Sequence, residues 1–177
     1  MGYSFEWADL REPATTARSR HQAHIELGEL CQGCTDKYHS LAAAYHFHLL
    51  NTAGMAFCRD GMRRTGMTYQ ATPQPFPDWP FDDTDDWRSA DQSRRNAYFE
   101  AERAASAQTV TGMVGIPEFK LTRNGPWLVG AREIEQALIL YHASSPSLHA
   151  EMEGDDLWVT WLNWLRQTVS HGGITVG

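Results

Sequence analysis

Apolar residues recur at spacings of three and four through residues 20–64. This periodicity predicts an amphipathic helix with a repeat close to a heptad. A break near Gly33 would divide the segment into two helices, so the pattern leaves both arrangements open. The stripe consists of Leu27, Leu30, Cys31, Cys34, Tyr38, Leu41, Tyr45, His48, Leu49, Thr52 and Met55.

Three further segments show helical patterns, at residues 87–109, 130–141 and 155–171. The first carries a face of small residues, which suits close helix packing. We expect that face to pack against the stripe of residues 27–55, within the chain or across a homodimer. The third segment places three tryptophans on one broad apolar face and ends in a glycine that is typical of a helix C-cap: Trp158, Trp161, Trp164 and Gly172.

A short strand is the best interpretation of residues 116–124, where apolar and polar residues alternate imperfectly before an Asn-Gly-Pro turn. The tail Ile174-Thr175-Val176 can add a second strand beside Phe119–Leu121. We therefore predict a mainly α domain over residues 1–177 with a small two-stranded β element, and an α+β arrangement is the alternative.

The sharpest change of composition falls at residues 65–86, which are predicted to form a loop. Prolines keep this segment extended, aromatic residues favour burial, and aspartates resist it. Either the aromatic side chains pin the loop to the protein's own core, or some of them dock into a basic-rimmed groove on a partner. The candidate partner-binding residues are Phe76, Trp79, Phe81, Asp82, Asp83, Asp85, Asp86 and, at the edge of the tryptophan face, Trp164.

Histidines and cysteines concentrate in the first helical segment, which raises a metal-binding alternative. Cys31, Cys34 and His39 have the spacing of a zinc knuckle, but Ala44 stands where the fourth ligand would be, and the next histidine is His46. Structural zinc needs four ligands that close a tetrahedron. We therefore expect no stoichiometric metal and no cofactor. About one zinc per chain in elemental analysis, lost in Cys34→Ala, would contradict this expectation.

Composition and motifs exclude several classes of function. The net charge of −7 and the lack of a basic run disfavour nucleic-acid binding. No apolar run reaches the roughly 20 residues of a membrane span. Three cysteines argue against a disulfide framework and favour the cytoplasm. The glycine patterns of phosphate-binding loops, dinucleotide sites and nucleophile elbows are absent from the sequence.

Three short runs in the C-terminal third resemble small uncharacterised proteins of actinobacterial phages and mobile elements. They are Asn124-Gly125-Pro126-Trp127-Leu128-Val129, Trp161-x2-Trp164-Leu165 and His171-Gly172-Gly173-Ile174. The resemblance covers about 50 residues and implies a phage or mobile-element setting, with no catalytic residues to transfer. The sequence thus favours a non-enzymatic interaction or accessory factor acting on a host protein, with a metal-binding enzyme or metal-stabilised domain as the alternative.

Overall fold

The computed structural model describes residues 2–8, 47–80, 92–122 and 126–176, and these residues are mainly helical. This confirms the predicted fold class. The described helices are α3 (Thr52–Arg64), α4 (Gln92–Ser106), α5 (Phe119–Thr122), α6 (Ala131–Ala143), α7 (Pro146–Met152) and α8 (Asp156–Thr168). None of them is both long enough and apolar enough to cross a bilayer.

The β element is larger than the predicted pair of strands. Four antiparallel strands form one sheet in the order β2 (Phe47–Asn51), β1 (Gly2–Trp7), β6 (Gly173–Val176) and β5 (Trp127–Gly130). A short parallel pair, β3 (Thr68–Tyr69) and β4 (Ile116–Pro117), stands apart from it. The tail therefore forms a strand, as expected, but its neighbours are β1 and β5.

The strand predicted over residues 116–124 is present only at its start, where Ile116–Pro117 form β4, because Phe119–Thr122 form α5. Three consecutive side chains are buried there, including the charged Lys120. A strand with one face in water would bury every second residue instead. Apolar and polar residues alternate imperfectly here because the segment is a short helix, in which Lys120 is buried against the carboxylate of Glu133.

The helix predicted over residues 20–64 is interrupted within its range, although its C-terminal end agrees with the end of α3 at Arg64. Residues 47–51 form β2, and the helix α3 begins at Thr52. Asn51 ends the strand and caps the helix, since its side-chain oxygen accepts the backbone N–H of Gly54 at 2.7 Å. Short apolar runs do not distinguish a buried strand from a buried helix. The remaining stripe positions from Leu27 to Tyr45 lie outside the described residues.

The three other helical predictions agree with the structure. Residues 87–109 and 155–171 contain α4 and α8, and the helix expected over residues 130–141 is α6, which extends to Ala143. The carboxylate of Glu133 accepts the Gly130 N–H at 2.8 Å at the start of α6. After α8, a 3₁₀ turn ends at Gly172, whose φ of 76° is the left-handed conformation of a C-cap.

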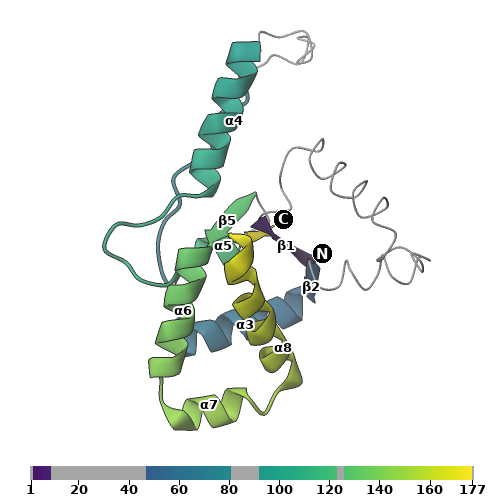
Figure 1. Cartoon of the computed structure of the whole chain (residues 1–177), viewed down its shortest axis with the longest axis vertical. Helices are drawn as coiled ribbons and strands as arrows, with labels where there is room; N and C mark the ends of the chain where they lie inside the picture. The colour runs from purple at the N-terminus through teal and green to yellow at the C-terminus, as the bar shows by residue number, and fades with distance from the viewer. Residues whose placement is uncertain (1, 9–46, 81–91, 123–125, 177) are drawn as a thin grey trace, which may run out of the picture.

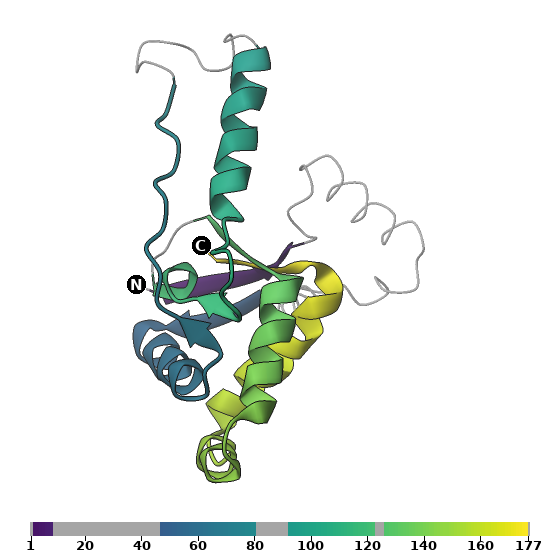
Figure 2. The ribbon, with the colours of Figure 1, turned by 90° about the vertical axis from the view of Figure 1, so that its left-hand side faces the viewer.

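Helices α3, α6 and α8 cover one face of the four-stranded sheet and enclose the core (Figure 1). Strand residues Val129 and Ile174 point into this core, together with Trp158 and Trp161 of α8. Alternate strand positions such as Leu128 and Thr175 belong to the opposite face. Helix α4 rises away from this body beside an extended segment of the chain (Figure 2).

Candidate partner-binding arm

Residues 70–80 and helix α4 together form a projection that we call the arm (Figures 1 and 2). The segment 70–80 contains neither helix nor strand, which agrees with the predicted loop. Of the 15 residues in α4, only Ser106, at its base, is buried. The arm therefore exposes most of its surface, in contrast to the three helices that enclose the core.

Contacts between the loop and the helix hold the arm together. The rings of Trp79 and Tyr98 meet edge to face with centroids 5.0 Å apart. The Arg94 guanidinium donates to the carbonyl of Pro80. Nearer the base, the Gln108 side chain accepts from the backbone N–H of Gln74 at 2.7 Å and donates to its carbonyl at 3.2 Å. The prolines keep the loop extended, so it follows the helix over several turns.

The two described aromatic residues of the predicted recognition loop differ in their surroundings. Phe76 is half-buried, and its ring lies 4.7 Å from that of Trp127 in the core. Trp79 leaves 51% of its surface exposed. Phe76 thus pins the loop to the body, while about half of the Trp79 surface faces solvent. Phe81, Asp82, Asp83, Asp85 and Asp86 lie outside the described residues.

Trp164 lies in the core and not on the surface. Its side chain is only 5% exposed and packs edge to face on Phe5 and in a stack with Trp161. Strand β1 covers the edge of the tryptophan face, which a helical wheel cannot show. Little of its surface is therefore left for the partner contact predicted from the sequence.

Further exposed apolar residues near the arm were not predicted from the sequence. Phe99 is 41% exposed on α4, and Val110, Met113 and Val114 are exposed in the turn that follows it. Gly112 and Gly115 flank the Met-Val pair, both with positive φ. This glycine-flanked apolar pair is the sequence signal for a displayed turn, because positive φ directs the chain sharply and favours glycine.

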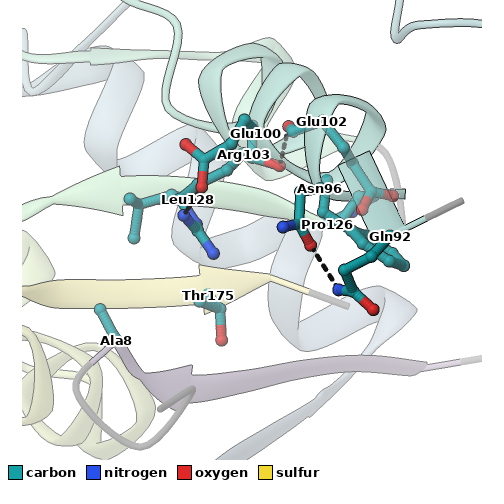
Figure 3. A pocket seen from close by; sticks show the side chains of 11 residues that line it. Ala8, Gln92, Asn96, Glu100, Glu102, Arg103, Pro126, Leu128 and Thr175 are labelled. Carbon is teal, nitrogen blue, oxygen red and sulfur yellow. Dashed lines mark hydrogen bonds and ion pairs between the residues drawn. The ribbon is translucent and has the colours of Figure 1, made fainter. Parts of the chain in front are cut away.

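A cleft of about 1170 Å³ separates α4 from the sheet (Figure 3). Helix α4 supplies one wall, and Leu128, Pro126, Thr175 and Ala8 line the opposite side, on or next to β5, β6 and β1. The residues on the helix wall are Gln92, Asn96, Phe99, Glu100, Glu102, Arg103 and Ser106.

The polar groups of the helix wall are mostly paired with each other. Gln92 donates to Asn96 at 2.8 Å, and Arg103 pairs with Glu100 at 2.8 Å. Within the described part of the chain, Glu102 has no ion-pair partner. The wall therefore carries one carboxylate without a compensating charge, besides neutral hydrogen-bonding groups and the ring of Phe99.

Lys120 and Glu133 form a buried ion pair, and its contacts indicate that it stabilises the fold. The ammonium donates to both carboxylate oxygens of Glu133, at 2.9 and 2.8 Å, and to the carbonyl of Leu128 at 2.7 Å. Burial lowers the pKa of Lys120 and raises the pKa of Glu133. All three donors of the ammonium are used, and one of them closes the outer edge of β5. A smaller cavity of about 300 Å³ adjoins Glu133.

Ser144 and His149 approach each other like a nucleophile and its base, with 2.9 Å between Oγ and Nε2. The same Nε2 lies 2.6 Å from the carbonyl oxygen of Tyr141, which can only accept. Nε2 must therefore carry the proton and cannot take one from Ser144. The pair ties α7 to the end of α6 and offers no activated nucleophile.

The metal alternative cannot be located in the structure. Cys31, Cys34, His39 and His46 lie outside the described residues. In the part of the chain that is described, no three histidine, cysteine or acidic side chains converge in a way that could hold an ion.

Comparison with protein-family models, with curated proteins and with solved structures found no match for this chain.

Proposed function

We propose that this chain is a non-enzymatic interaction factor whose arm docks into a groove on a protein partner. The resemblance of its C-terminal third supports a phage or mobile-element setting, with a host protein as the partner. Its cysteine content supports action in the cytoplasm, where thiols stay reduced.

The observation that carries the proposal is the exposure of the arm. Helices draw most of their stability from packing an apolar face, yet α4 buries only Ser106. Trp79 is held in place on Tyr98 but remains half in water. A tryptophan positioned in this way gains roughly 1.5–3 kcal/mol when a partner buries it. Exposed aromatic anchors at fixed positions are characteristic of protein interfaces.

The sequence around Trp79 indicates the chemistry of the partner. Asp78 precedes it, and Asp82, Asp83, Asp85 and Asp86 follow within seven residues. Carboxylates around an apolar anchor complement a pocket with lysines or arginines at its rim. Pro77 and Pro80 bracket Trp79 and reduce the entropy lost when the loop becomes ordered on a partner.

The experiment compares Trp79→Ala with wild type in quantitative affinity capture from host extract. We expect a protein with a basic surface to be retained by wild type and lost with the variant, and the purified protein to bind with at least tenfold lower affinity after the substitution. The melting temperature should change little, because about half of the Trp79 surface is already exposed to water.

Phe76→Ala is the matched control, since it removes a neighbouring aromatic residue that packs on Trp127. It should lower stability clearly. A sharp loss of stability in Trp79→Ala, or unchanged binding, would overturn the proposal. A dimer of wild type that dissociates in Trp79→Ala would identify a second copy as the partner and reject the host protein.

A further inference from the structure

The floor of the cleft beneath α4 contains a polar group without a partner. Thr175 lies on β6, between β1 and β5, and lines the cleft although its residue surface is only 5% exposed. Its hydroxyl has no hydrogen-bond partner. A buried hydroxyl that is left unpaired is unfavourable, so native proteins rarely keep one without a reason.

The size and charge of the cleft restrict what can enter it. Its volume of about 1170 Å³ exceeds the usual range of small-molecule sites, which extends from about 300 to about 1,000 Å³. Among the described residues that line it, Arg103 is the single cation and is already paired with Glu100. These described lining residues therefore offer a nucleic acid or another polyanion no unpaired positive charge.

The lining suits a polypeptide. Leu128, Pro126 and Phe99 offer apolar contact, while Thr175 offers a hydroxyl that can donate to a carbonyl or accept from an amide. The carboxylate of Glu102 has no ion-pair partner among the described residues. A lysine or arginine of the incoming segment would form an ion pair with it. This preference agrees with the acidic sequence of the neighbouring loop.

We propose that this cleft is a peptide-binding site, which receives a segment of a protein partner with a basic residue beside Glu102 and a backbone group hydrogen-bonded to Thr175. This inference rests on the proposed function, because both require a protein partner. It uses the face of α4 toward the sheet, whereas the proposed function uses Trp79 on the loop side of the arm.

The test starts from a random 12-residue peptide library displayed on phage and panned against the whole chain. Enriched peptides are synthesised with a fluorophore, and their affinity is measured by anisotropy. Thr175→Val should weaken binding about three- to tenfold, the effect of one lost hydrogen bond. The same variant should raise the melting temperature of the peptide-free protein by about 2–4 °C, because the unpaired hydroxyl is gone.

Two other buried threonines serve as matched controls. Thr68 also has a hydroxyl without a partner, but it does not line the cleft. Thr68→Val should therefore stabilise the protein and leave peptide affinity unchanged. Thr168 donates its hydroxyl to the carbonyl of Leu165 at 2.7 Å. Thr168→Val should lower stability and likewise spare binding.

A steric pair tests the location independently of Thr175. Asn96 lines the cleft, whereas its neighbour Ala97 is exposed on α4 outside the lining. Asn96→Trp should abolish binding of the enriched peptides, and Ala97→Trp should not. The inference is overturned if no peptide is enriched, or if enriched peptides bind equally well to Asn96→Trp and Thr175→Val. Peptides that depend on Trp79 but not on Asn96 would support the arm as an interface and reject the cleft.

Discussion

Helices α4 and α8 have similar lengths, but α8 is packed in the core whereas α4 is largely exposed. Helix α8 buries six of its 13 residues, among them three tryptophans, beneath the sheet and between α3 and α6. Helix α4 buries one residue of 15. A sequence pattern that predicts a helix therefore does not say whether the chain itself covers that helix.

The difference follows from what each helix presents to its surroundings. The large rings of α8 each gain roughly 1.5–3 kcal/mol by leaving water, which is enough to organise a core. Helix α4 offers mainly alanines, arginines and glutamates, and its contacts include those of Tyr98 and Arg94 with the adjoining loop. The side chains of α8 thus help to form the core, while the described side chains of α4 remain largely exposed.

The largest effect is expected for Trp161→Ala. The indole is fully buried, donates to the sulfur of Met62 at 3.4 Å and meets Phe5 with ring centroids 5.1 Å apart. Its removal should lower the free energy of unfolding by about 3–5 kcal/mol, measured by urea denaturation. Phe99→Ala on α4 is the comparison and should cost under about 1 kcal/mol. Equal losses in the two variants would contradict the division between body and arm.

A smaller but clear effect is expected for Gly61→Ala, where α3 crosses α8. A Cβ at this position would lie 2.5 Å from the Met152 Cε and 2.6 Å from the ring of Trp158. Alanine favours a helix more than glycine does, by about 1 kcal/mol. Overpacking costs about 1–3 kcal/mol and should outweigh that gain. A variant more stable than wild type in urea denaturation would show that the α3–α8 contact is looser than the structure indicates.

The sequence predicted the helical class of the fold, together with α6 and α8, because their caps and apolar faces are local signals. Gly130 with Glu133 and Asp155 with Gly172 mark the ends of these helices in the sequence itself. The four-stranded sheet was missed because its order joins residues from both ends of the chain. Nothing near Gly2–Trp7 in the sequence reveals that β6 pairs with it.

The candidate site could be predicted only in part. Proline, tryptophan and aspartate in one short segment predicted a loop and suggested a recognition role for it, and the structure shows the loop, with Phe76 half-buried and Trp79 exposed. The cleft was beyond prediction, because it forms between α4 and a sheet whose outer face includes Leu128 and Thr175. Trp164 was misplaced for the same reason, since the strand that covers it lies far away in the sequence.

The smallest expected effect is the change in the free energy of unfolding of the whole protein when α4 or α6 is weakened. Ala101→Gly in α4 and Glu135→Gly in α6 both introduce glycine at an exposed helical position, at a local cost of about 0.5–1 kcal/mol. Helix α6 packs on α8 and on the sheet, so the loss there should appear in full in the urea midpoint of the whole protein.

Helix α4 contributes only Ser106 to the buried interior, so Ala101→Gly should leave the urea midpoint nearly unchanged. The same substitution should accelerate amide hydrogen exchange in α4 about two- to fivefold, the factor equivalent to that local cost, while protection in α8 stays as in wild type. If Ala101→Gly lowered the midpoint as much as Glu135→Gly does, α4 would unfold together with the body. The arm would then be an integral part of the core, and its exposed surface would no longer argue for a partner.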